Sequence, residues 1–227
     1  MDKLSLLVRS SVGRKLLNGL TGFFLIIFVA AHLGGNLNIL LGPDAFNGYA
    51  VKLWSLGPLV YIIEIGLALL FLVHAFMGTT VFIGKLRARP DGYRMQKSAG
   101  TPSRQTISSK TMIYTGVLLL AFLVWHLWQF RFGPHYTTMY HGQEARDLYR
   151  LVVEVYSSAT NVVIYEAIMI LLGFHLWHGF WSAFQTLGVS NPKYANPIHT
   201  LGYFVAVIVA AGFLSIPPYI YFTGGAR

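Results

Sequence analysis

The amino-acid sequence predicts an all-α integral membrane protein, a single domain over residues 1–227 with five transmembrane helices. Of its 227 residues, 55% are hydrophobic and only 11% are charged, and the mean hydropathy is +0.55. A soluble domain carries about a quarter charged residues. The apolar residues are also gathered into five long stretches, and most of the positive charges fall on one side of them. A lipid bilayer is therefore the expected solvent.

Five stretches are long enough to cross about 30 Å of hydrocarbon, which takes roughly 20 residues. They cover residues 16–40, 57–84, 111–130, 160–187 and 198–222. Each is expected to be helical, because lipid cannot satisfy the free backbone groups of an open structure. The first begins too late and runs too long for a signal-peptide core, and no cleavage site ends it. It is therefore expected to remain as a membrane span.

The distribution of lysine and arginine predicts the orientation. If the N-terminus lies inside, twelve of the 17 cations fall in the inner segments and five in the outer ones. Positive residues concentrate on the cytoplasmic side of membrane proteins, so the N-terminus is expected in the cytoplasm. The inner loop 85–110 is basic and reads as irregular. In the outer loop 131–159, apolar residues at helical spacing predict a short amphipathic helix on the outer surface.

Composition excludes several classes of function. The net charge of +9 could suggest nucleic acid, but no polar domain displays it, so no nucleic-acid partner is expected. The chain has no cysteine, which excludes disulfides, thiolate metal sites and iron–sulfur ligation. No loop is long enough to house a catalytic domain.

Histidine is the unexpected residue of the apolar stretches. His32 lies in the first, His74 in the second, His126 in the third, and His175 and His178 in the fourth. Helical rise of about 1.5 Å per residue, counted from the inner end of each helix, gives their heights. His32 and His126 lie about 25 and 24 Å up, and His74 and His175 about 16 and 19 Å. The spacing therefore predicts an outer pair, His32 with His126, and an inner pair, His74 with His175.

The sequence thus predicts two pairs of imidazoles, with the members of each pair at one height on different helices. This arrangement suits haem b, whose iron is held axially by two histidines. The fold expected is thus a five-helix bundle around two b haems, with these four histidines as iron ligands. Zinc or copper is a weaker alternative, since each level offers two imidazoles and no thiolate. Proton-relay histidines in a haem-free transporter are a second alternative, although such transporters favour broken helices and mid-membrane acids.

The carboxylates and cations near the span ends are candidates for supporting roles. Glu64 and Glu166 are the two carboxylates within spans, and both project to the outer ends of their helices. A carboxylate near the outer haem could accept protons from a quinol, and an acid facing water at the interface is the plainer interpretation. Arg14, Lys15, Lys85 and Arg131 are candidates to pair with haem propionates, or to act as charge anchors.

A set of motifs, in this order along the chain, resembles the cytochrome b membrane anchor of succinate dehydrogenase and fumarate reductase, in its single-chain, five-helix, two-haem class. The motifs are "SSVGRKLLNGLTGFFLIIFVAAHLGGNLNIL", "FNGYA", "LVHAFMGTTVFIG", "LVWHLWQFR" and "GFHLWHGFWSAFQTLGV". Carried over, the family's axial ligands fall on the same four histidines. The resemblance implies that His74 with His175 holds the haem proximal to the cytoplasmic partner, and that His32 with His126 holds the distal haem.

Two positions near the fourth ligand distinguish this chain within the resemblance. The family's ligand stands four residues before a glycine, which selects His175, before Gly179, over His178. Some members carry a glutamate two residues before that ligand as a proton route. Gly173 occupies the position here, so that route is in doubt.

The resemblance implies electron transfer between a quinone, menaquinone by family analogy, and partner subunits at the bacterial cytoplasmic membrane. Those partners are a flavoprotein with FAD and an iron–sulfur protein. The chain has no cysteine, nucleotide fingerprint or substrate domain, so it could relay electrons but not oxidise succinate. An anchor of a hydrogenase or formate dehydrogenase is the alternative. The direction of turnover, the position of the quinone site and the oligomeric state are left open.

Overall fold

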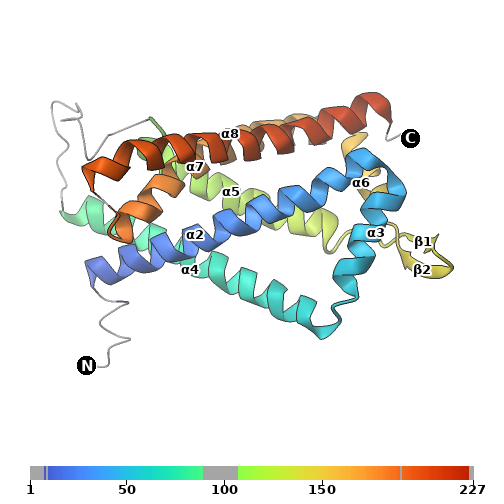
Figure 1. The fold of residues 1–227 in the computed structure, drawn as a ribbon, viewed down its shortest axis with the longest axis horizontal. Coiled ribbons are helices and arrows are strands. Elements are labelled where there is room, and N and C mark those ends of the chain that lie inside the picture. The colour runs from blue at the N-terminus through green and yellow to red at the C-terminus, as the bar shows by residue number, and fades with distance from the viewer. Residues whose placement is uncertain (1–7, 9, 89–106, 190, 225–227) are drawn as a thin grey trace. The chain divides into compact units, whose positions relative to one another are not determined.

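The computed structural model describes residues 8, 10–88, 107–189 and 191–224. In these residues five helices are long and apolar enough to cross a membrane. They are α2 (Ser11–Asn36), α4 (Pro58–Ala88), α5 (Ile107–Phe130), α7 (Ala159–Thr186) and α8 (Pro192–Thr223) (Figure 1). The prediction of a multi-pass α-helical membrane protein is confirmed. Most of the inner loop falls outside the described residues.

Large apolar side chains face outward along these helices, as a lipid solvent requires. Ile62 and Leu72 of α4 are 65% and 60% exposed, and Val117 of α5 is 58% exposed. A soluble protein of this size rarely exposes contiguous apolar surface on such a scale. The exposure agrees with burial in hydrocarbon.

Several helices run beyond the predicted apolar stretches. Helix α2 begins five residues earlier than expected and α8 six residues earlier. At α8 the cause is local, because the Asn191 Oδ1 accepts a hydrogen bond of 2.9 Å from the Lys193 backbone N–H. An asparagine cap followed by proline starts a helix independently of lipid. Hydropathy marks the apolar part of a span, and the helix itself ends where its caps lie.

The segment after α2 forms two further helical elements. A short 3-10 helix, η1 (Leu37–Leu41), is followed by α3 (Pro43–Trp54). Gly42 joins them with φ at 97°, a conformation that favours glycine. Asn47 of α3 is buried and bonds in both directions: its Nδ2 donates to Asp147 Oδ1 at 2.9 Å, and its Oδ1 accepts from Tyr149 N at 2.9 Å. These bonds attach α3 to the start of the next short helix.

That next helix is α6 (Leu148–Tyr156), which confirms the short amphipathic helix predicted in the outer loop. Its apolar residues Leu151 and Val152 are buried against protein. The loop also holds an antiparallel hairpin that the sequence analysis did not predict, β1 (Thr137–Tyr140) and β2 (Gln143–Arg146). The hairpin lies beside α3 in Figure 1.

The chain forms two compact units, and each long helix contributes a segment to both. Unit 1 comprises residues 1–27, 67–117 and 174–206, and unit 2 comprises residues 28–66, 118–173 and 207–227. In unit 1, the ring of Phe23 meets that of Phe184 edge-on at 5.8 Å. The expectation of a single domain stays a prediction.

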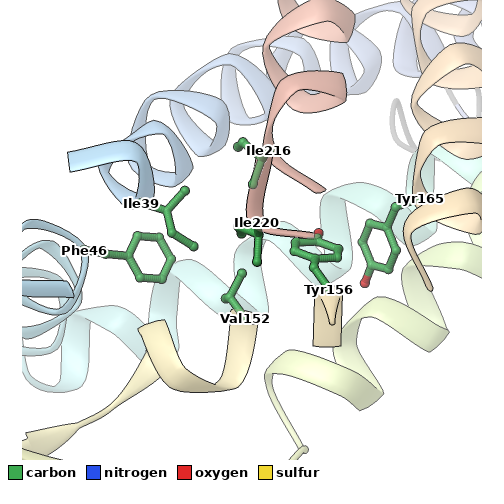
Figure 2. Packing of buried hydrophobic residues seen from close by; sticks show 7 residues of the cluster. All are labelled: Ile39, Phe46, Val152, Tyr156, Tyr165, Ile216 and Ile220. Atoms are coloured by element: carbon green, nitrogen blue, oxygen red, sulfur yellow. The ribbon is translucent and has the colours of Figure 1, made fainter. Parts of the chain in front are cut away.

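Unit 2 has a hydrophobic cluster that joins the short elements to the long helices. Figure 2 shows its members around Ile220, which is 1% exposed. They are Ile39, Phe46, Val152, Tyr156, Tyr165, Ile216 and Ile220. The cluster holds Tyr165 of α7 in a fixed position, which matters for the neighbouring histidine described below.

Candidate metal-binding histidine pairs

The histidine rings predicted as the inner pair face each other within unit 1. His74 lies on α4 and His175 on α7, and their ring centroids are 6.4 Å apart with an interplanar angle of 74°. The two residues are 101 positions apart in sequence, so only the packing of the helices brings them together. The two histidines that helical rise placed at one level are thus neighbours in the structure.

Hydrogen bonds at Nδ1 fix the orientation of both inner rings. His74 Nδ1 lies 3.1 Å from the Asn18 backbone oxygen, which can only accept, so the nitrogen carries the hydrogen. His175 Nδ1 lies 3.0 Å from Thr115 Oγ1. The Thr115 hydroxyl already donates to backbone oxygens of its own helix, the nearer at 3.1 Å, so it accepts from Nδ1–H. Each ring therefore keeps an unprotonated Nε2, the form that binds metals.

Glycines of the neighbouring helices allow the backbone to approach these rings. A Cβ added to Gly22 of α2 would lie 2.9 Å from His74 Cε1, closer than side-chain atoms normally come. A Cβ added to Gly116 of α5 would lie 3.6 Å from His175 Cε1, at ordinary contact distance. Gly22 is thus required for the observed position of His74.

The outer pair is formed within unit 2. His32 of α2 and His126 of α5 have ring centroids 6.0 Å apart at an interplanar angle of 89°. His32 also stacks on Phe28 at 5.5 Å. His126 Nδ1 lies 3.3 Å from the Tyr165 hydroxyl. This pairing agrees with the sequence prediction as well.

The centroid separations within both pairs fall in the range of about 4.5–7 Å that edge-to-face ring pairs adopt, and they also leave room for one metal ion between two imidazoles. A metal–imidazole bond is about 2 Å, and a ring nitrogen lies about 1 Å from its centroid, so opposed ligands have centroids about 6 Å apart. Within the described residues, no group of three or more His, Cys, Asp or Glu side chains is placed to hold a metal ion. Two histidines are the protein ligands that a bis-histidine haem would require.

His178, the fifth histidine within the predicted spans, belongs to neither of the two ring pairs. It is His175, and not His178, whose ring meets His74. His199, at the start of α8, stacks on Trp181 with ring centroids 3.8 Å apart. The structure thus agrees with the choice of His175 over His178 as the partner of His74.

The predicted carboxylates lie in unit 2, in two different environments. Glu64 forms an ion pair with Arg131, with Arg131 Nε donating to Oε1 at 2.9 Å and Nη2 donating to Oε2 at 3.1 Å. The guanidinium carbon of Arg131 also lies 5.5 Å from the centre of the Trp54 ring. Glu166 has a buried Oε1 without a hydrogen-bond partner among the described residues. Glu64 and Arg131 were separate candidates in the sequence, and only the structure shows that they bind each other.

The other predicted cations belong to unit 1, the unit of the inner pair. Arg14 Nε donates to the Ser10 backbone oxygen at 3.4 Å, and the side chains of Lys15 and Lys85 are exposed. They stand near the ends of α2 and α4, where long basic side chains reach the membrane surface.

A pocket of about 330 Å³ opens in unit 2 between the end of α5, α6 and the start of α7. Its polar lining includes Gln129, Glu154 and Asn161, and its apolar walls include Trp128, Leu151 and Val155. Gln129 Oε1 accepts a hydrogen bond of 2.7 Å from the Tyr165 hydroxyl. Sequence reasoning missed both Gln129 and Tyr165, because an amide and a phenol near a span end are common and carry no spacing signal.

Comparisons of the chain with protein-family models, curated proteins and solved structures found no match. The functional interpretation therefore depends on the sequence and on the geometry described above.

Proposed function

We propose that this chain is the di-haem cytochrome b membrane anchor of a succinate:quinone oxidoreductase, the membrane subunit of a succinate dehydrogenase or fumarate reductase. The observation that carries the proposal is the pair of imidazole–imidazole separations, 6.4 Å for His74 with His175 and 6.0 Å for His32 with His126. In each pair the two imidazoles are close enough that they would hold one iron between them. The resemblance of the motifs supports the choice of enzyme.

The residues present fit haem b in further respects. The Nδ1 contacts of His74 and His175 leave Nε2 available as a ligand. Small residues beside the rings, Gly22 and Gly116, let helix backbones come close. A bis-histidine haem, when bound, accepts and releases one electron at a time. The protein's part is to hold the four imidazoles in fixed positions within an apolar surrounding.

We assign each candidate cation to the propionates of one haem according to the compact unit in which the cation lies. Arg14, Lys15 and Lys85 belong to unit 1 with the inner pair, and we assign them to the propionates of the proximal haem. Arg131 belongs to unit 2 with the outer pair. Its bidentate bond to Glu64 leaves one terminal nitrogen for a propionate.

Quinone reduction or oxidation is assigned to unit 2. The pocket beside Gln129 is large enough for a one- or two-ring head group. Glu166 and Glu64 remain the candidates for proton transfer. Glu166 is the better placed of the two, because one of its oxygens is buried and has no hydrogen-bond partner among the residues that the structure describes. Menaquinone is the quinone that the resemblance favours.

The partners follow from what the chain lacks. With no cysteine and a high share of apolar residues, it requires an iron–sulfur subunit and an FAD-containing flavoprotein to exchange electrons with succinate or fumarate. We place the N-terminus and the basic inner segments on the cytoplasmic side of a bacterial membrane, facing these subunits. Anionic lipid would bind the same charges.

Visible spectroscopy of the purified chain, with measurement of bound haem, tests the proposal. We expect about two haems per chain and the spectrum of low-spin, bis-histidine haem b. A chain without a Soret band that catalyses proton-linked uptake in vesicles would instead be a haem-free transporter. A nickel or molybdenum subunit that co-purifies with the di-haem chain would indicate a hydrogenase or formate dehydrogenase.

A further inference from the structure

The Nδ1 partner of His126 differs in kind from the partners of the inner pair. His74 and His175 bond to a backbone oxygen and to a threonine whose hydrogen is engaged within its own helix. His126 Nδ1 instead lies 3.3 Å from the hydroxyl of Tyr165, a phenol whose hydrogen is not engaged within its own helix. A hydroxyl can donate or accept, so something else must decide the direction of this bond.

Gln129 decides it. The Tyr165 hydroxyl lies 2.7 Å from Gln129 Oε1 and 3.3 Å from His126 Nδ1. A phenol has one hydrogen, and the shorter contact receives it. Towards His126 the oxygen then offers only lone pairs, and Nδ1 must carry the hydrogen. The reverse arrangement, with the phenol donating to Nδ1, would place a hydrogen on Nε2, the nitrogen left to bind a metal.

The residues packed around Tyr165 hold its side chain in place, so its hydroxyl cannot turn to another hydrogen-bond partner. Tyr165 is 3% exposed. Its ring has the rings of Phe122 and Tyr156 at 5.0 Å and that of Trp125 at 5.3 Å. Figure 2 shows Tyr165 next to Tyr156 in the hydrophobic cluster of unit 2. The hydroxyl therefore stays between Gln129 and His126.

We propose that Tyr165, oriented by Gln129, is a positioning residue that holds His126 in the Nδ1–H tautomer and so keeps its Nε2 free for metal binding opposite His32. Its consequence for redox chemistry rests on the proposed function. An acceptor at Nδ1–H makes the ligating nitrogen more basic, which stabilises ferric over ferrous iron. Tyr165 thus lowers the reduction potential of the haem on the outer pair.

The first test uses Tyr165→Phe in the full chain, with redox titration of the haems. We expect the haem that depends on His126 to shift to a higher midpoint potential and to bind about 10-fold more weakly. The other haem should keep its wild-type potential. Gln129→Leu should shift the same haem in the same direction, because the phenol is then released to donate to Nδ1.

Two control variants make the result specific. Tyr156→Phe removes the same atom from a buried ring 5.0 Å from Tyr165, and no contact joins Tyr156 to His126 in the part of the chain described. It should leave both potentials unchanged. Thr115→Val removes the acceptor from His175 and should shift the other haem alone. Equal shifts of both haems in Tyr165→Phe, or no shift, would overturn the proposal.

A second test needs no haem. Nitrogen-15 spectra of the histidine rings in haem-free chain report the tautomer directly, with His126 assigned by its loss in His126→Ala. We expect the Nδ1–H form in the wild type and a mixture of tautomers in Tyr165→Phe. An unchanged tautomer would refute the role of Tyr165. Should no variant bind haem while the tautomer changes as expected, the proposed function fails and the positioning role stands.

Discussion

Arg131 and Glu64 form a bidentate ion pair, with donor–acceptor distances of 2.9 and 3.1 Å, between the end of α5 and the first turns of α4. Their side chains are 34% and 38% exposed, so solvent screens part of the attraction. Two parallel bonds also define an orientation. The pair therefore attaches the 58–66 segment of α4 to α5 within unit 2.

Removing one charge of this pair should weaken unit 2 modestly. We expect Glu64→Gln to lower the free energy of unfolding by about 1 kcal/mol, at the upper end of exposed ion pairs. Thermal unfolding in detergent measures it. Glu144→Gln is the matched control, because Glu144 of the hairpin is exposed and has no ion pair within the described ranges. Equal effects of the two variants would show that the pair contributes nothing.

Replacement of the paired histidines should remove the haems separately. His74→Ala and His175→Ala are each expected to lose one haem, and His32→Ala and His126→Ala the other, because one imidazole cannot supply both axial ligands. Haem content and redox titration of the purified variants measure this. His178→Ala is the control and should retain both haems. A variant His178→Ala without the inner haem, combined with haem retention in His175→Ala, would contradict the assignment.

Helix α2 should tolerate a larger side chain at Gly34 but not at Gly22. Gly22→Leu places a side chain where a Cβ alone would lie 2.9 Å from His74 Cε1. We expect displacement of the His74 ring and loss of the haem on the inner pair. Gly34→Leu, in the same helix, has no atom within 4 Å of the added Cβ and should keep both haems. The ratio of haem to protein distinguishes the two outcomes.

The buried amide of Asn47, in the short helix α3, should contribute measurably to the stability of unit 2. Asn47→Ala leaves Asp147 Oδ1 and the Tyr149 N–H without their partner. We expect a loss of about 1–3 kcal/mol, typical of buried groups left unsatisfied, seen as a lower melting temperature in detergent. Asn38→Ala removes only bonds to backbone oxygens three and four residues away, and its effect should be smaller.

Alkaline pH should destabilise the protein through Tyr156. Burial, together with the nearby Tyr165 and Glu166, raises the pKa of Tyr156 well above its usual value of 10.0. Above pH 10 the unfolded chain loses a proton that the folded chain retains, so stability falls as pH rises, by up to about 1.4 kcal/mol per pH unit. Unfolding measured from pH 9 to 11 should show a smaller slope in Tyr156→Phe. Identical slopes would contradict this.

Some short elements were beyond sequence reasoning for identifiable reasons. The hairpin turns at His141 and Gly142, with φ at 48° and 79°. Two positive φ values normally call for Asn-Gly or Gly-Gly, so His-Gly gave no turn signal. Helix α3 carries Asn47 and Gly48 in its middle, both weak helix formers. Its helix depends on tertiary bonds such as those of Asn47.

The amino-acid sequence by itself determined the five long helices and the level of each paired histidine, because hydropathy and helical rise are properties of one stretch of chain. Only the tertiary structure decided which groups meet those histidines. His126 and Tyr165 are 39 residues apart, His74 and Asn18 are 56, and Arg131 and Glu64 are 67. Such contacts depend on how each helix is rotated about its axis against its neighbours. Rotation is set by side-chain packing across helices, which no local pattern records.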